Sequence, residues 1–160
     1  MAAPSISWFR CTKSGPTYSA ITSLNFGTVT AGMWSVEKCI RPKVAVNSIQ
    51  SAKWWFYDVK GVRSGVETSV GSAAGWRHYM TITGTYVTVS ATGPKGSANL
   101  TAGGSVKWKR MPQTTGSGVA YSAVSSGAYG DYVYYAIKVA SAAGDGAHTL
   151  WGYQLKYSYT

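Results

Sequence analysis

The sequence is poor in charged residues, and above all in acidic ones. Charged residues make up 12% of its 160 residues, about half of the roughly 25% usual in soluble domains. Only five are Asp or Glu, and three of these, Asp58, Asp131 and Asp145, lie in turn-like contexts. Catalysis by a pair of carboxylates is therefore poorly supported. The 15 Lys and Arg give a formal net charge of +10, which favours attraction to polyanions.

Histidine and cysteine are equally scarce. His78 and His148 are too few for a three-histidine metal site, and the spacing of Cys11 and Cys39 fits no zinc motif. The chain lacks a Gly-x-Ser-x-Gly nucleophile elbow, and its glycine-rich stretches lack a Walker lysine. We therefore expect no enzyme activity, no cofactor and no metal site. We expect the cysteines to be free, partly buried thiols, with a disulfide as the alternative if their strands are adjacent.

Long apolar runs and targeting signals are also missing. No window approaches the roughly 20 apolar residues of a membrane span. The segment Met1–Ile6 has no basic n-region and no apolar h-region, so we expect no signal peptide and synthesis in the cytoplasm. No capping box leads an apolar run of helical period, so no helix is predicted.

Aromatic and β-branched residues are abundant, and they alternate with a period of two. Such alternation runs through residues 133–139 and 151–159, and Gly144–Gly146 between them predicts a hairpin. Further predicted strands are the runs at 5–11, 33–46, 49–58, 106–111 and 119–124. The run at 76–91 predicts one long strand or two, with Gly84 as a possible bulge. Pro42, inside one of these runs, predicts a bulge, an edge position or two strands that meet.

Seven to nine strands without helices predict an all-β fold, an antiparallel sandwich or barrel, with residues 1–160 as a single domain. Asp131, Val133, Tyr135 and Ile137 resemble the Asp-x-hydrophobic-x-Tyr-x-Cys pattern of immunoglobulin domains, which favours the sandwich. The resemblance implies that Tyr135 forms a tyrosine corner and that Trp54 or Trp55 is the core tryptophan. Ile137 stands in place of the family's cysteine, so the fold would be immunoglobulin-like only.

A second resemblance concerns the two ends of the chain. Residues 24–32, Leu-Asn-Phe-Gly-Thr-Val-Thr-Ala-Gly, with Ser35, and the closing pattern Trp-x-Tyr-x-Leu-x-Tyr-x-Tyr at 151–159 resemble immunoglobulin-like sandwich domains of bacteriophage tail and capsid-surface proteins. This resemblance implies a structural role and a location in the virion.

Seven Trp and twelve Tyr exceed what one small core needs, and rings left outside a core act as interface anchors or stacking platforms. Neighbouring Trp54 and Trp55 must point to opposite faces of a strand, so one of them enters the core. The predicted interface residues are Trp54, Trp55, Trp108, Trp151 and Tyr153. The predicted basic patch is Lys107, Lys109 and Arg110.

These features predict a non-enzymatic structural subunit that assembles with copies of itself or with other virion proteins through aromatic surfaces. Two alternatives stay open. One is a carbohydrate- or cell-surface-binding module, a role that sandwiches often have. The other is a basic protein that contacts a polyanion such as nucleic acid.

Overall fold

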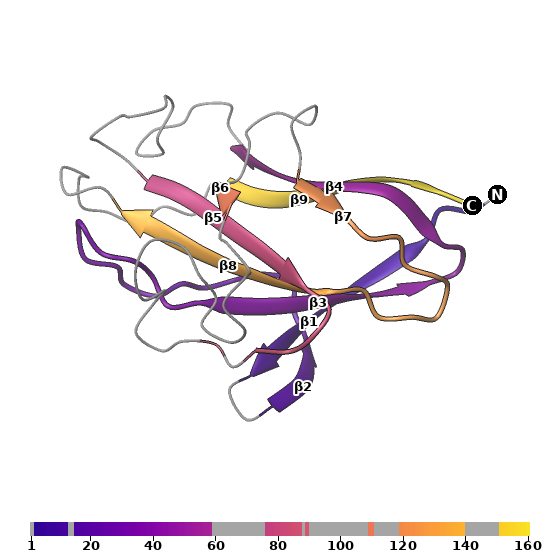
Figure 1. Cartoon of the computed structure of the whole chain (residues 1–160), viewed down its shortest axis with the longest axis horizontal. Helices are drawn as coiled ribbons and strands as arrows, with labels where there is room; N and C mark the ends of the chain where they lie inside the picture. Colours follow the sequence, from indigo (N-terminus) through magenta and orange to yellow (C-terminus); the bar gives the residue numbers. More distant parts are fainter. Residues whose placement is uncertain are drawn as a thin grey trace.

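The chain folds as two antiparallel β-sheets packed face to face, which confirms the predicted all-β sandwich (Figure 1). The computed structural model describes residues 2–12, 15–58, 76–87, 89, 109–110, 119–139 and 151–160. This part of the chain contains no helix, and therefore none long and apolar enough to cross a membrane. Its strands are β1 (Ser5–Thr12), β2 (Gly15–Ala20), β3 (Lys38–Ala45), β4 (Ile49–Asp58), β5 (Trp76–Thr83), β6 (Lys109–Arg110), β7 (Val119–Tyr121), β8 (Tyr132–Val139) and β9 (Trp151–Tyr159).

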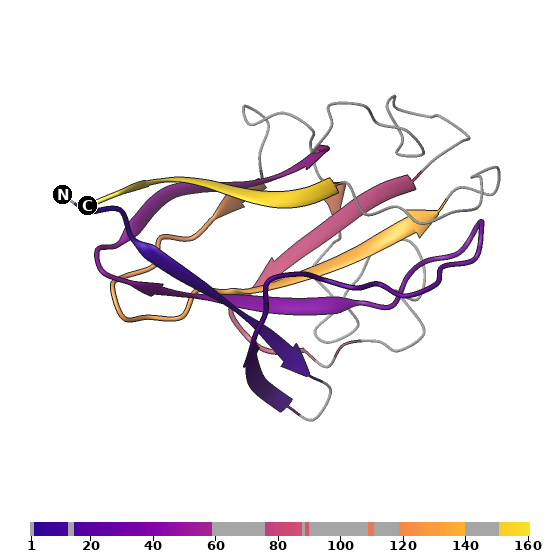
Figure 2. The ribbon, with the colours of Figure 1, turned by 180° about the vertical axis from the view of Figure 1, so that it is seen from behind.

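One sheet has the strand order β2-β1-β3-β8-β5-β6, and the other has the order β7-β4-β9. The long strands β1, β3, β8 and β5 form the centre of the larger sheet, while β2 and the short β6 lie at its edges. Both ends of the chain lie side by side at one end of the sandwich (Figures 1 and 2). There Ser48 and Thr160 exchange backbone hydrogen bonds, which join the final residue to the start of β4.

The predicted hairpin of residues 133–139 and 151–159 is wrong. β8 pairs with β3 and β5, whereas β9 pairs with β4, so the two strands belong to different sheets. They meet across the core instead, where the rings of Tyr135 and Tyr153 stack with centroids 4.1 Å apart. The turn at Gly144–Gly146 lies outside the described residues. Alternation predicted both strands correctly, but it does not determine which strand each one pairs with.

The main core lies between the sheets and is centred on Trp54, which is 2% exposed. The ring of Trp54 packs edge-on against Tyr121 and Tyr135 and lies 5.3 Å from that of Trp8. The prediction that Trp54 or Trp55 supplies the core tryptophan is therefore confirmed for Trp54. The tyrosine corner is wrong for Tyr135, because within the described part its hydroxyl has no hydrogen-bond partner.

The larger sheet also buries part of its outer face, the face turned away from the smaller sheet. The buried residues of this outer cluster are Cys11, Cys39, Val87, Tyr132, Tyr134 and Ala136. Residues 76–91 were predicted to form one long strand or two, with a possible bulge at Gly84, but β5 ends at Thr83. Residues 84–87 fold over the outer cluster instead, and we call them the flap. Two tyrosine hydroxyls hold it: Tyr86 donates to the Thr12 carbonyl, and Tyr134 bonds both backbone groups of Val87.

Pro42 lies inside β3, between β1 and β8, although proline has no N–H for a ladder. Its carbonyl accepts a 2.9 Å hydrogen bond from the Gly130 amide, so its nitrogen also faces that side of the strand. The paired residues of β3 and β8 end at Ile40 and Val133, before Pro42 is reached. Ile40 pairs with Val133 but Lys43 pairs with Tyr129, so three steps along β3 are matched by four along the segment that leads into β8. The ladder therefore contains a bulge beside Pro42, which matches the bulge alternative and not the edge.

Candidate functional site

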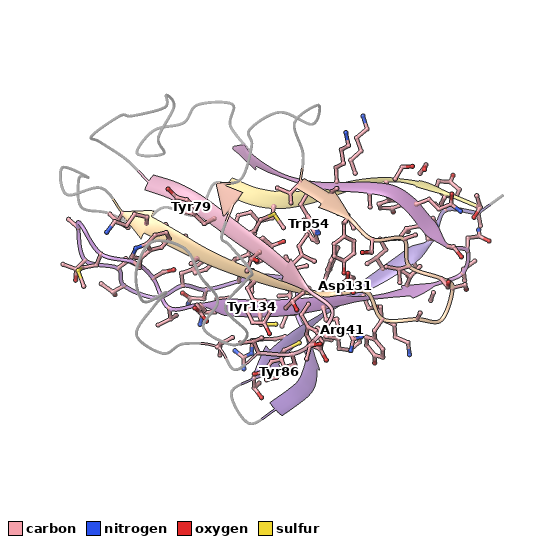
Figure 3. The ribbon with its side chains drawn as sticks, in the orientation of Figure 1. Arg41, Trp54, Tyr79, Tyr86, Asp131 and Tyr134 are labelled. Carbon is pink, nitrogen blue, oxygen red and sulfur yellow. The ribbon has the colours of Figure 1, made fainter. Side chains whose placement is uncertain are left out.

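One predicted interface residue, Trp54, lies in the core. Trp54 lies between the two sheets and is buried within the subunit, so the prediction that it anchors a neighbour is wrong (Figure 3). Tyr153 is half-buried and stacks on Tyr135. Burial raises the pKa of the Tyr153 phenol well above its ordinary value, and the side chain packs against the main core. Tyr153 therefore contributes mainly to the core as well.

The other predicted residues stay predictions. Trp55 and Trp151 belong to β4 and β9, but their side chains are not among those the structure describes. Trp108 and Lys107 lie outside the described residues. Lys109 and Arg110 form β6, whose backbone pairs with Met80 and Tyr79 of β5 at the edge of the larger sheet. Lys109 and Arg110 of the predicted basic patch thus lie on a sheet edge, and their side chains are outside the described part of the structure.

A group of side chains that was not predicted lies on the outer face of the larger sheet. It comprises Phe9, Arg41, Lys43 and Tyr129, and we call it the Arg41–Tyr129 patch. Phe9 of β1 is directly opposite Arg41 of β3, and Tyr129 is bridged to Lys43 by the backbone. Because side chains alternate along a strand, Arg41 and Lys43 share the face on which Phe9 lies. Strand pairing therefore collects two cations and two rings from three segments.

Tyr129 is the exposed centre of the patch, with 36% of its surface accessible. The Arg41 guanidinium carbon and the Lys43 Nζ each lie 5.2 Å from the centroid of its ring. The Phe9 ring meets it edge-on with centroids 5.8 Å apart. Cations within about 6 Å of an aromatic centroid are attracted by the ring quadrupole. The contacts therefore hold Tyr129 in a fixed orientation at the surface.

Gly130 and Tyr132 hold the guanidinium of Arg41 in place. Its Nε donates to the Gly130 carbonyl over 2.5 Å, and one terminal nitrogen donates to the Tyr132 hydroxyl over 3.1 Å. Its carbon lies 4.4 Å from the Tyr132 ring centroid. A guanidinium fixed in this way loses little rotamer freedom when it binds a further group. Figure 3 shows Arg41 on the side of the larger sheet opposite Trp54.

The patch is positively charged, and the chain as a whole has only five acids against 15 Lys and Arg. Two of these acids have described side chains. Glu37 is buried, and Asp131 accepts a 2.9 Å hydrogen bond from the Ser122 hydroxyl. An exposed ring beside fixed cations can bind a partner through its carboxylates, phosphates or aromatic rings. The patch is thus equipped for recognition.

Sequence reasoning missed the patch because it depends on register between distant segments. Residues 9, 41 and 129 are far apart in the chain, and none of them belongs to a recognisable motif by itself. The one available signal was the placement of Arg41 and Lys43 on either side of Pro42, on a common face of one predicted strand.

Comparison with known proteins finds no matching family and no matching curated protein. What the fold and the patch define is therefore a class: an all-β protein of two packed antiparallel sheets with a cation–aromatic surface on its larger sheet.

Proposed function

We propose that this protein is a non-enzymatic structural subunit that joins a larger assembly, a bacteriophage virion, through the Arg41–Tyr129 patch. The observation that carries the proposal is an exposed tyrosine held in place by Phe9, Arg41 and Lys43. Tyrosine and arginine are enriched among residues that dominate binding energy at interfaces. The resemblance of residues 24–32 and 151–159 to phage sandwich domains supports the virion as the setting.

The charge of the patch constrains how neighbours meet. Two copies that met patch to patch would bring four cations together, which is unfavourable. The contact is therefore heterologous: the patch meets a different and less basic surface of the next subunit. Heterologous contacts build rings or extended arrays rather than isolated dimers, which fits a protein present in many copies.

The test is the state of assembly of two matched variants, Tyr129→Ala and Tyr159→Ala. Tyr129 and Tyr159 are both exposed, at 36% and 41%, but Tyr159 lies at the end of β9 and not in the patch. We expect concentration-dependent multimers of the wild-type protein by light scattering. Tyr129→Ala should weaken assembly at least tenfold, about the effect of losing one interface hot spot, and Tyr159→Ala should leave it unchanged. A wild-type protein that stays monomeric at high concentration, alone and with virion components, contradicts the proposal.

A second candidate function is contact with a polyanion, and a specific pair of residues favours it. Lys53 of β4 and Lys156 of β9 lie directly opposite each other, and both side chains are exposed. Like charges directly opposite across a ladder are destabilising, and a bound phosphate would relieve the repulsion. The outer face of the smaller sheet is therefore the surface we assign to this second role.

Binding of double-stranded DNA at several salt concentrations tests this second role. We expect the logarithm of affinity to fall steeply with the logarithm of salt concentration. The double substitution of Lys53 and Lys156 by Gln should reduce the slope by about 2, since each phosphate contact contributes about 0.9. Lys38→Gln, a single change on β3, is the control. Affinity that does not depend on salt would contradict this role, because neutralised phosphates make binding salt-dependent. An equal loss per charge from Lys38→Gln would assign the effect to net charge and not to the Lys53–Lys156 pair.

A further inference from the structure

Two cysteines from different strands lie directly opposite each other on the outer face of the larger sheet. In the ladder of β1 and β3, Cys11 is paired with Cys39. Their side chains are 2% and 1% exposed, and both belong to the outer cluster. Both are free thiols. The strands that carry the two cysteines are therefore adjacent, which is the condition under which the sequence allows a disulfide.

The type of pairing at this position fixes the distance between the two residues. Trp8 turns its carbonyl toward Ile21, and Pro42 turns its carbonyl toward Gly130, so the Trp8–Pro42 pair makes no hydrogen bonds to each other. Hydrogen-bonded and non-hydrogen-bonded pairs alternate along an antiparallel ladder, so the Cys11–Cys39 pair, three positions further on, is hydrogen-bonded. Such pairs have Cα atoms about 5.5 Å apart, inside the range of about 4.4–6.8 Å that disulfides span.

The two thiols differ in reactivity. The hydrogen bond with Cys39 is the largest influence on Cys11, and together with the Arg41 charge it lowers the pKa of the Cys11 thiol in spite of burial. Burial, followed by the interaction with Cys11, raises the pKa of the Cys39 thiol far above its ordinary value. The thiolate is the nucleophile in disulfide exchange. For the proposal that follows, we assign the attack to Cys11 and the resolving step to Cys39.

The flap covers part of the cluster that contains this pair. Val87 of the flap lies in the same buried cluster as both cysteines. Its amide donates to the Tyr134 hydroxyl over 2.7 Å, and its carbonyl accepts from that hydroxyl over 2.8 Å. The Tyr86 hydroxyl anchors the flap to the Thr12 carbonyl, next to Cys11 in β1. Among the described residues, these few hydrogen bonds hold the flap over the cluster that contains the cysteines, and breaking them requires local rather than global unfolding.

We propose that Cys11 and Cys39 form a reversible thiol–disulfide pair that low-molecular-weight disulfides oxidise when the flap opens. The Cys11 thiolate attacks one sulfur of the oxidant, a disulfide RSSR, and expels one RS⁻. Cys39 loses its proton and attacks the Cys11 sulfur of the mixed disulfide, which expels the second RS⁻. The cysteines lose two electrons and two protons, and RSSR becomes two RSH. This inference does not depend on the proposed assembly function.

Glutathione disulfide is the probe for this proposal. The folded protein is incubated with it, quenched with acid, treated with N-ethylmaleimide under denaturing conditions and weighed by mass spectrometry. We expect the wild-type protein to lose about 2 Da and to take up no maleimide, since two thiol hydrogens leave when the bond forms. Reduced glutathione should then restore two reactive thiols. Peptide mapping should locate the bond between Cys11 and Cys39.

Single variants separate the two steps and the flap. Cys39→Ala should stop at a mixed disulfide of Cys11 with glutathione, whereas Cys11→Ala should keep Cys39 as a thiol. Tyr134→Phe, which removes both flap bonds to Val87, should speed oxidation roughly tenfold. Tyr86→Phe supplies the same test if Tyr134→Phe does not fold. The proposal is overturned if the folded wild-type protein keeps both thiols at every glutathione ratio, or if it stops at a stable mixed disulfide.

Discussion

Replacing Gly130 with alanine should destabilise the protein by about 3 kcal/mol, the range of an overpacked core position. A Cβ atom at this position would lie 2.3 Å from the Tyr121 hydroxyl oxygen and 3.0 Å from carbon atoms of Pro42 and Val124. Tyr121 cannot move aside without loss. It is buried, it packs edge-on against Trp54, and its hydroxyl donates a 2.7 Å hydrogen bond to the Asp131 carbonyl.

Urea denaturation measures this effect, and two other glycines are the controls. At Gly84 an added Cβ would make an ordinary 3.6 Å contact with Asp131, so Gly84→Ala should change stability by less than about 0.5 kcal/mol. At Gly127 there is open space, but the φ angle of +81° strains any other residue, so Gly127→Ala should cost about 1 kcal/mol. A Gly130→Ala variant as stable as Gly84→Ala would contradict the close packing.

A double variant identifies the clash itself. Tyr121→Phe removes the oxygen nearest to the added Cβ, although it also removes the hydrogen bond to Asp131, worth about 1 kcal/mol. Gly130→Ala should therefore destabilise the Tyr121→Phe protein less than it destabilises the wild-type protein. Additive effects of the two changes would mean that Pro42 and Val124, and not the Tyr121 hydroxyl, oppose the methyl group.

Loss of close packing at Gly130 has a consequence at the patch. The Gly130 carbonyl accepts from Arg41 Nε, and the Gly130 amide donates to Pro42. Residue 130 also follows Tyr129 directly, so a shift of its backbone would move the exposed ring. The glycine therefore lets β3 and the segment before β8 approach closely enough to build the Arg41–Tyr129 patch.

Much of the fold was predictable from local pattern. Alternation in residues 133–139 and 151–159 identified both strands, and the neighbouring pair of tryptophans required one ring in the core, which is that of Trp54. The partner of each strand was not predictable. Turn residues at Gly144–Gly146 are compatible with a hairpin, but the same alternation suits two strands stacked in different sheets, with Tyr135 against Tyr153.

The candidate sites were harder to predict for a physical reason. Arg41, Tyr129 and the Cys11–Cys39 pair become neighbours only through the register of β1, β3 and β8. A shift of one residue would move each of them to the other face of the sheet. No local composition marks that register. The outer cluster was also unexpected, because residues 84–87 have the alternation of a strand and yet fold over the sheet as a flap.

Tyr134 and Tyr135 are adjacent in β8, point to opposite faces of the sheet and should respond oppositely to replacement by phenylalanine. Both rings are fully buried. The Tyr134 hydroxyl bonds the amide and the carbonyl of Val87, and burial raises its pKa far above the ordinary value, so it stays protonated and donates. Tyr134→Phe should cost about 2 kcal/mol, because it leaves two buried backbone groups without this partner.

Tyr135→Phe should be neutral or should stabilise the protein by up to about 1 kcal/mol. Among the described residues, no group accepts from or donates to the Tyr135 hydroxyl, and burying such a group without a bond is unfavourable. The stacked contact with Tyr153 and the edge contact with Trp54 need only the ring. Urea denaturation of both variants measures the difference, and hydrogen exchange of the Val87 amide should quicken in Tyr134→Phe alone. Equal destabilisation by the two changes would show that the ring environment, and not the bond to the flap, sets the role of each tyrosine; the flap would then not depend on Tyr134 to cover the cysteines.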